Sequence, residues 1–301
     1  MMRDNCRDRT IPMRYAAIAT LLLVNISCPA IAESLADPAQ VDLLVVAPHS
    51  DDEAIGCTGA ILRANAERKR VGIVVVTAGD GFPKAATAHG KKTVDRLTAD
   101  DFVNLAALRQ RHTLQAMERL EVKADDVMFL GFPDGGLEPM YRSQDDGSYR
   151  QPFTGKSETY GPVAVDYHRR VHGRPAPYTR AAVLANLMEI IKTRKPREIY
   201  LTGEADTHAD HRATFWFVRD AAREAGFQGS LWTFVVHGRE PDQPPDRRLV
   251  LTDSELTTKQ KLLEGYQVGV SPVHDQLAAT YAKPEERFWS VTVTQAKPKP
   301  E

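Results

Sequence analysis

Short runs of apolar residues recur along the chain, and each is followed by a polar turn and a stretch with helical periodicity. The clearest run is Leu43–Ala47, which is apolar at every position. Such a run predicts a strand that is covered on both faces of a parallel sheet. Similar runs lie at residues 71–77, 125–131, 197–202 and 231–237. The alternation of strands and helices predicts a Rossmann-like α/β fold, with a mostly parallel sheet flanked by helices.

The helical stretches have apolar residues at intervals that bury one face. They lie at residues 101–120, 180–192, 213–224 and 253–266, and a further helix is expected to open around Gly56 or Thr58. Residues 82–100 are small and polar and predict a mobile loop. Residues 138–178 lack periodicity but contain several tyrosines. This insertion predicts a lid over an extended substrate, or alternatively a surface excursion whose aromatic side chains fix it in place.

Strongly polar residues follow the first strand directly. Pro48 ends the strand, and one imidazole and three carboxylates come next, at His49, Asp51, Asp52 and Glu53. In open α/β sheets ligands bind at the carboxyl ends of the strands, so we expect the active site at this edge. His49 and Asp52 are spaced to reach one ion. Asp51 is directed differently, which leaves a carboxylate beside a metal.

A second polar block, His208–His211, follows the run at 197–202 and precedes a helical stretch. Because strand, polar turn and helix recur in the same order, both blocks are expected at the same sheet edge. A catalytic zinc site has three protein ligands and an open position. His211 is the preferred third ligand, with His208 as the alternative, and one Zn²⁺ per chain is expected.

The two blocks together carry a resemblance. The segment Ala47-Pro48-His49-Ser50-Asp51-Asp52-Glu53 and the block at 208–211 resemble the paired signature of the LmbE-like, or PIG-L, zinc-dependent de-N-acetylases. Ser50 and Ala209 stand where that family usually has proline. Residues 131–137 resemble the family loop with a substrate-contacting aspartate, here Asp134, and Arg109 stands where the family has an arginine near the substrate.

The resemblance implies removal of the N-acetyl group from an N-acetylglucosamine-type amino sugar in a glycan, glycolipid or glycoconjugate. Asp51 is then the general base, and His208 is the oxyanion partner or proton donor. Asp210 would orient His211, since zinc-bound imidazoles usually have a carboxylate partner. Arg109 and Asp134 are the candidates for substrate binding. The alternatives are a metal-dependent amidase or esterase on a different conjugate, and a non-catalytic carbohydrate-binding module.

The N-terminal 32 residues predict a cleaved signal peptide. Four arginines precede an apolar run at residues 16–26, and an Ala-x-Ala arrangement ends at Ala32. The run is shorter than the roughly 20 residues that a membrane span needs. We therefore expect an exported protein, periplasmic or secreted, without a stable membrane span. Cys28 raises the question of lipidation, but the residue three positions before it is Asn25 rather than an aliphatic one.

Length and composition fit one catalytic domain, residues 33–301. The chain has 301 residues, of which 42% are hydrophobic, enough for a single large core. Lys plus Arg number 39 and Asp plus Glu number 40, so nothing predicts nucleic-acid binding. Signal cleavage leaves Cys57 as the one cysteine and therefore excludes an intramolecular disulfide. The oligomeric state is not predicted.

Overall fold

The computed structural model describes residues 40–144, 147–270 and 275–293. All of these belong to one compact unit of the chain. The predicted signal peptide lies outside the described residues, so export stays a prediction. None of the helices in the described part of the chain has the length and apolarity that a bilayer crossing requires.

Within the described residues, seven strands form one sheet in the order β3-β2-β1-β4-β5-β7-β6. Their bounds are β1 Leu43–Ala47, β2 Val71–Thr77, β3 Val127–Phe132, β4 Glu198–Thr202, β5 Ser230–Phe234, β6 Arg247–Val250 and β7 Glu285–Val291. Strands β1 to β5 pair in parallel, and β7 and β6 are added antiparallel at one edge. The predicted mostly parallel sheet is thus confirmed.

The order in which strands are added to the sheet changes direction at β1. Strands β2 and β3 follow on one side of β1, and β4 and β5 follow on the other. Leu43 of β1 is in register with Val71 of β2 and with Glu198 of β4. The loops after β1 and β4 therefore leave the sheet in opposite directions and open a crevice between them, which is where doubly wound folds bind ligands.

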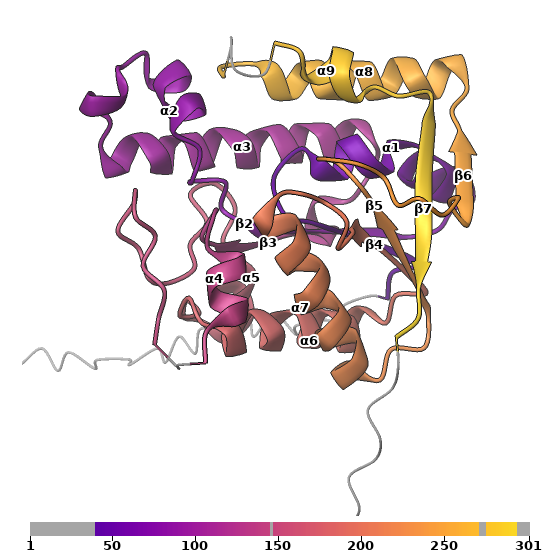
Figure 1. Cartoon of the computed structure of the whole chain (residues 1–301), viewed down its shortest axis with the longest axis horizontal. Helices are drawn as coiled ribbons and strands as arrows, with labels where there is room; N and C mark the ends of the chain where they lie inside the picture. The colour runs from indigo at the N-terminus through magenta and orange to yellow at the C-terminus, as the bar shows by residue number, and fades with distance from the viewer. Residues whose placement is uncertain (1–39, 145–146, 271–274, 294–301) are drawn as a thin grey trace, which may run out of the picture. The chain divides into compact units, whose positions relative to one another are not determined.

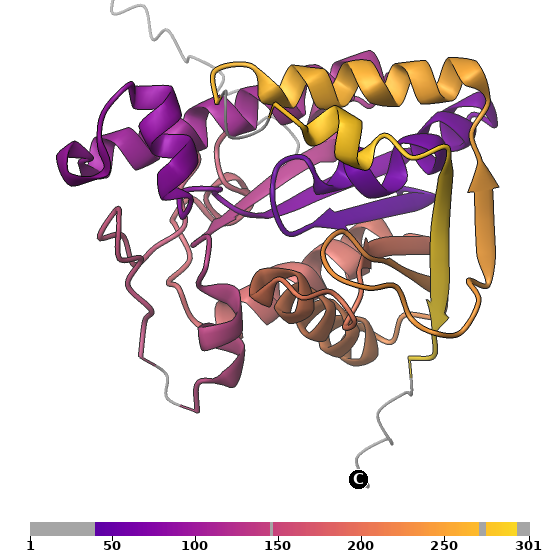
Figure 2. The same ribbon diagram turned by 45° about the horizontal axis from the view of Figure 1, so that its top comes forward.

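Helices cover both faces of the sheet (Figures 1 and 2). One face carries α1 Asp52–Ala66, α3 Ala99–Arg119 and α8 Asp253–Gln267, and the other carries α6 Arg180–Arg194 and α7 Ala209–Ala225. Alternate residues of β1 serve the two layers. Leu43 and Val45 pack in the cluster with α1, α3 and α8, whereas Leu44 and Val46 pack in the cluster with α6 and α7. Because both faces are buried, β1 is apolar at every position.

Several of the predicted elements differ from the observed ones. Strand β5 ends at Phe234 rather than at His237, and α7 begins at Ala209 rather than at Ala213. The segment 82–100 is not a plain loop, because it contains α2 Pro83–Gly90 and a 3-10 turn, Val94–Arg96. Its alanines Ala85 and Ala86 are buried against Phe102 and Leu105 of α3, so small residues here mark close packing. Helix α1 begins at Asp52, earlier than Gly56, because Asp51 already makes the turn out of β1.

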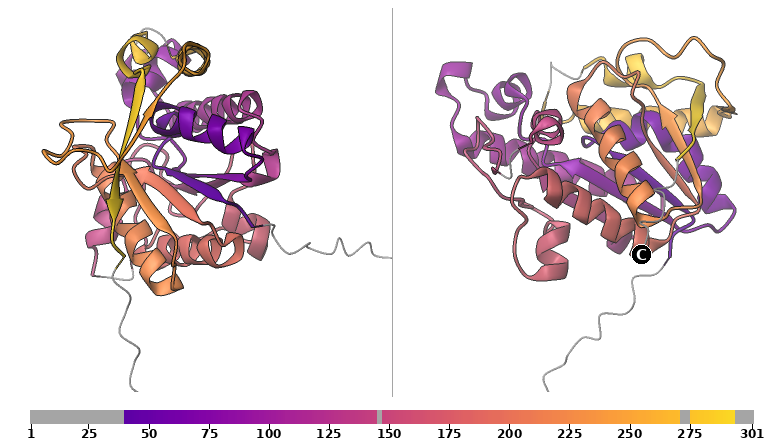
Figure 3. Two further views of the ribbon diagram at one scale, coloured as in Figure 1. Left: turned by 90° about the vertical axis from the view of Figure 1, so that its right-hand side faces the viewer. Right: turned by 60° about the horizontal axis from the view of Figure 1, so that its bottom comes forward.

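The remaining short helices are α4 Leu137–Arg142, α5 Tyr167–His172 and α9 Leu277–Tyr281. Helices α4 and α5 lie in or beside the segment predicted as a lid. Tyr167 and Tyr178 of that segment are buried in the core. Figure 3 shows β7 and β6 at the far edge of the sheet, with α8 and α9 beside their ends.

Candidate functional site

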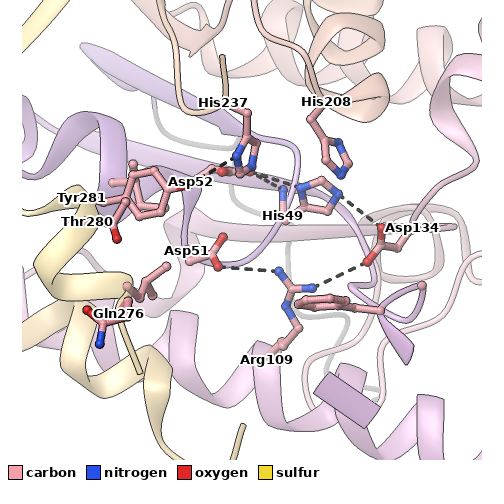
Figure 4. Close-up of a pocket in the computed structure, with 14 residues that line it drawn as sticks. His49, Asp51, Asp52, Arg109, Asp134, His208, His237, Gln276, Thr280 and Tyr281 are labelled. Atoms are coloured by element: carbon pink, nitrogen blue, oxygen red, sulfur yellow. Dashed lines mark hydrogen bonds and ion pairs between the residues drawn. The ribbon is translucent and has the colours of Figure 1, made fainter. Parts of the chain in front are cut away.

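Loops after five strands, β1 to β5, meet at the carboxyl edge of the sheet and line a cavity of about 450 Å³ (Figure 4). The loop after β1 supplies His49, Asp51 and Asp52, and the loop after β3 supplies Asp134. His208 comes from the loop after β4, and His237 from the segment after β5. The rest of the lining comes from α1, the loop after β2, α3 and the region of α9, namely Ile55, Gly81, Phe82, Arg109, Gln276, Leu277, Thr280 and Tyr281. The structure thus brings the two predicted polar blocks together.

The turn after β1 holds Asp51 in a strained conformation. Its φ is 116°, a region that residues other than glycine seldom adopt. The backbone N–H of Asp51 donates to Glu53 Oε2 at 3.1 Å, and Tyr266 Oη of α8 donates to the other Glu53 oxygen. The Asp51 carboxylate makes no capping hydrogen bond to α1. It therefore remains available for chemistry in the cavity.

Three side-chain atoms form a nearly equilateral triangle. His49 Nδ1 lies 3.2 Å from His211 Nε2 and 3.3 Å from Asp52 Oδ2, and the latter two atoms are 3.2 Å apart. In a tetrahedral zinc site with bonds of about 2.0–2.1 Å, neighbouring ligand atoms are about 3.3 Å apart. The triangle fits such a site, and all three side chains are buried.

The hydrogen bonds behind the imidazoles fix their tautomers. A carboxylate only accepts, so His211 Nδ1 carries the proton that it donates to Asp206 Oδ2 at 3.0 Å. In the same way His49 Nε2 faces Asp134 Oδ1 and Asp210 Oδ2, each at 3.3 Å. The nitrogens that remain, His49 Nδ1 and His211 Nε2, point their lone pairs at the triangle, as metal ligation requires.

The prediction that Asp210 orients His211 is wrong. Neighbouring residues at the start of a helix point in different directions, so Asp210 cannot turn back to the ring of His211. Its carboxylate instead accepts from Gly135 N at 2.6 Å and Leu137 N at 3.0 Å, and it faces His49. The partner of His211 is Asp206, which sequence reasoning missed.

The charges of the metal-free site favour a cation. Although burial opposes a charged imidazole, Asp52 and Asp206 raise the pKa of His211 to about 9. Burial likewise opposes protonation of His49, but the carboxylates of Asp134, Asp210 and Asp52 raise its pKa. Without metal, protons on the rings of His49 and His211 balance the negative charge of the buried carboxylates. A bound metal ion would take the place of these protons. Metal affinity should therefore fall as the pH falls.

His208 is the other candidate ligand. Nitrogens of His49, His208 and His211 lie within 4.8 Å of one another, a looser set than the triangle with Asp52. His208 Nδ1 accepts the backbone N–H of Asp210 at 3.3 Å, so a neutral ring carries its proton on Nε2. Burial, with the positive charge of His49 and His211, lowers the pKa of His208 to about 4. His208 is thus a neutral N–H donor at pH 7.

In Figure 4, Arg109 lies below His49 and Asp134 lies to the right of it, and a dashed line joins the two side chains. Arg109 Nη1 is 3.6 Å from Asp134 Oδ2, and its Nη2 is 3.8 Å from Asp51 Oδ2. The Asp134 backbone is fixed by its N–H, which donates to Asp80 Oδ1 at 3.1 Å. Tyr160 of the predicted lid donates to Asp80 Oδ2 at 2.8 Å. No cavity-lining residue among those described comes from residues 138–178, and closure of that segment stays a prediction.

His237 also belongs to the site. Its ring lies 5.0 Å from that of His211, and Tyr281 Oη is 3.3 Å from its Nδ1. Its backbone N–H donates to Asp206 Oδ2 at 3.0 Å. The position of His237 just beyond a strand end was the available signal in the sequence, but no neighbouring motif supported it.

The sequence profile of the PIG-L family, described as GlcNAc-PI de-N-acetylase, matches residues 44–222. This range is more than half of the chain and contains both polar blocks. The chain belongs to the PIG-L family. The resemblance predicted from the two motifs is thereby confirmed. No curated protein sequence matches the chain.

Solved structures of LmbE-like deacetylases share the fold. A deacetylase of teicoplanin biosynthesis superposes with a TM-score of 0.53 at 18% identity, over 85% of this chain and 100% of that one. The N,N'-diacetylchitobiose deacetylase of Pyrococcus horikoshii gives 0.52 at 17% identity, over 85% and 86%. GalB, the 4-carboxy-2-hydroxymuconate hydratase of Pseudomonas putida KT2440, gives 0.54 at 16% identity, over 87% and 100%.

These likenesses show the fold, and a hydratase shares it. Membership of the PIG-L family, together with the deacetylases among the structures, supports a de-N-acetylase activity, which is hydrolysis of an amide. The PIG-L range ends at residue 222, and His237 and the residues of α9 line the cavity from outside that range.

Replacement of Asp206 by asparagine should weaken metal binding. An amide at this position no longer enforces the Nδ1–H tautomer of His211, and loss of such a partner typically lowers metal affinity 10–100-fold. Competition with a chromophoric chelator measures the change. Asp242→Asn, on an exposed loop, is the matched control. Equal zinc affinity of Asp206→Asn and the native protein would contradict the assigned tautomer.

Proposed function

We propose that this protein is a zinc-dependent hydrolase that removes the N-acetyl group from an N-acetylglucosamine-type amino sugar. The observation that carries the proposal is the triangle of His49, Asp52 and His211 with the carboxylate of Asp51, which makes no capping hydrogen bond, in the same cavity. Binding of a sugar alone would require neither feature.

His49 Nδ1, Asp52 Oδ2 and His211 Nε2 would hold the metal ion. Two nitrogens and one carboxylate oxygen are a donor set that zinc accepts, and three protein ligands leave a position open. When bound, zinc supplies Lewis acidity, which polarises a carbonyl oxygen and makes water a stronger nucleophile at neutral pH. Asp206, Asp134 and Asp210 keep the two imidazoles oriented for this role.

Asp51 acts as the general base. Burial raises the pKa of Asp51 to about 7, although the positive charge of Arg109 opposes the shift. A base with a pKa near the working pH combines a useful deprotonated fraction with a strong tendency to accept a proton. Asp51 takes the proton of the attacking water and passes it to the departing amine nitrogen. Water and the amide are thereby converted to acetate and the free amino sugar.

His208 stabilises the negative charge that develops on the carbonyl oxygen. Its ring is neutral at pH 7 and its Nδ1 is occupied by the Asp210 N–H, so Nε2–H is the donor. Such a donor is already oriented before the reaction and needs no rearrangement when the charge appears. Arg109 and Asp134 line the same cavity and are the groups for sugar hydroxyls.

The direct test is acetate release from a panel of N-acetylglucosamine compounds, with the protein stripped of metal and then resupplied with zinc. The proposal expects turnover that zinc restores. Zinc binding without acetate release from any compound would overturn the acetyl-sugar assignment. Failure to bind zinc would overturn the metal site itself. The predicted signal peptide favours export, and an exported enzyme would find its substrate among envelope or extracellular glycans or glycoconjugates.

The acid side of the pH profile should depend on Arg109. Asp51 must be deprotonated to act, so kcat/KM falls as the pH drops through its pKa, which a bound cation places below the value of about 7. Arg109→Gln removes a positive charge that lowers this pKa, so its acid limb should move to higher pH. Arg111→Gln, an exposed arginine on the same helix, should leave the limb in place. Superimposable limbs for Arg109→Gln and the native protein would rule out Asp51 as the titrating base.

A further inference from the structure

The cavity has two walls of opposite chemistry. One wall presents Arg109, Asp134 and His208, and Gly81 and Phe82 line the cavity beside them. The other is built from α9 and the first turn of α1 and includes Leu277 and Ile55. These two side chains are 8% and 9% exposed and belong to the same hydrophobic cluster, and Tyr281 packs against it. An apolar surface that lines a hydrolytic site indicates an apolar group on the substrate.

The two walls lie on opposite sides of the reacting groups. In Figure 4, Gln276, Thr280 and Tyr281 lie on one side of Asp51, and Arg109 and Asp134 lie on the other. A secondary amide is planar and trans, so the substituent on its nitrogen and the chain on its carbonyl carbon point away from each other. With the sugar against Arg109 and Asp134, the acyl chain is directed at α9.

The α9 wall also offers more than an acetyl group needs. An acetyl group has a single methyl, whereas this wall combines Leu277, Ile55 and Tyr281. Gln276 and Thr280 line the cavity at exposed positions, so, among the residues that the structure describes, the cavity reaches solvent along α9. Helix α9 lies outside the range that matches the PIG-L profile, so the family match itself says nothing about this wall.

We propose that the α9 wall is an acyl subsite, and that the protein prefers amino sugars whose N-linked acyl chain is linear and longer than acetyl. The inference rests on the proposed amide hydrolysis and names its substrate class more closely. Leu277 and Ile55 contact the methylenes next to the carbonyl, and Thr280 borders the part of the chain nearer solvent.

The test compares N-acetyl-, N-propionyl-, N-butyryl- and N-hexanoylglucosamine with the zinc-loaded full chain. Glucosamine is the product in every case, so one assay serves the series. Each methylene that the wall buries should raise kcat/KM about fourfold. Leu277→Asn should lower the butyryl-to-acetyl ratio of kcat/KM about tenfold, whereas Leu277→Ile should keep the rise with chain length.

A second variant guards against a folding defect in Leu277→Asn. Thr280 is exposed, so Thr280→Val adds apolar surface to the wall without disturbing the core. It should raise the hexanoyl-to-acetyl ratio about twofold or more. Thr257→Val, at an exposed position of α8 away from the cavity, is the matched control and should leave the ratio unchanged.

The outcomes separate the two claims. Release of glucosamine that is fastest from the acetyl compound and falls with chain length overturns the acyl subsite and leaves the proposed function intact. A higher kcat/KM with an octyl glycoside of N-acetylglucosamine, together with no rise along the N-acyl series, also overturns the acyl subsite. The wall would then bind the octyl aglycone rather than the acyl chain. No release from any compound overturns the proposed function and the acyl subsite together.

Discussion

Asp51→Asn is expected to lower kcat by about 10²–10⁴-fold, the range for loss of a general base, while the protein still binds one zinc ion. The carboxylate makes no capping bond to α1 and lies at the corner of the turn, beside the ligand triangle and not within it. Removal of this carboxylate should therefore abolish proton transfer by Asp51 and leave the proposed metal ligands in place. Steady-state kinetics on an N-acetylated amino sugar, with metal content measured on the same sample, give both quantities.

Asparagine is the right replacement because of the backbone. Asp51 has a φ of 116°, and among residues other than glycine, asparagine and aspartate tolerate positive φ best. Alanine would change the turn and the base together. Asp95→Asn, on an exposed 3-10 turn, is the control for loss of a carboxylate as such. If Asp51→Asn keeps more than about a tenth of the native kcat, another group takes the proton.

The central strands and the two ligand motifs could be predicted because their signals are local. A strand such as β1, which is buried on both faces, is apolar at every position. The polar residues that follow it are therefore easy to recognise in the sequence. The parallel topology then determines that the corners after β1 and β4 meet. From these facts alone His49, Asp52 and His211 could be placed in one site.

The carboxylates behind the ligands could not be assigned in the same way. Asp210 stands beside His211 in the sequence, but its carboxylate faces the ring of His49. The carboxylate that accepts the hydrogen bond from His211 belongs to Asp206, five residues earlier in the chain. Which carboxylate meets which ring depends on the directions of side chains in the first turn of α7, and sequence adjacency does not give these. A search of the sequence for acidic residues in the loop that precedes α7 would have included Asp206.

The C-terminal part of the site was also missed, for a different reason. Strand β7 contains Glu285, Glu286 and Arg287, so it has the polarity of an exposed segment. Glu286 is nevertheless buried, because it accepts from Lys259 at 2.9 Å and from Gly59 N of α1 at 2.9 Å. Lys259 lies 27 residues before Glu286 and Gly59 lies 227 residues before it, so neither partner can be recognised from the local pattern of β7. Helix α9, only five residues long, likewise has too few positions to show a period.

His211→Ala is expected to abolish tight zinc binding, and with it turnover and the stabilisation that zinc confers. At a zinc concentration 100-fold above Kd, binding to the folded state alone adds about 2.7 kcal/mol to the free energy of unfolding. For a domain of this size that corresponds to a rise in Tm of roughly 5–10 °C. Addition of zinc to metal-stripped native protein should produce this rise, and His211→Ala should not respond.

The metal-free Tm separates loss of a ligand from loss of a fold. The pKa of His211 is raised to about 9, so without metal its ring is protonated at pH 7 and pairs with Asp52 and Asp206. His211→Ala also removes that pairing, and its metal-free Tm should lie below that of the native protein. His172→Ala, which removes an exposed imidazole from α5, should keep the full response to zinc. A zinc response in His211→Ala equal to that of the native protein would transfer the third ligand position to His208, whose nitrogen is the next imidazole nitrogen within reach of His49.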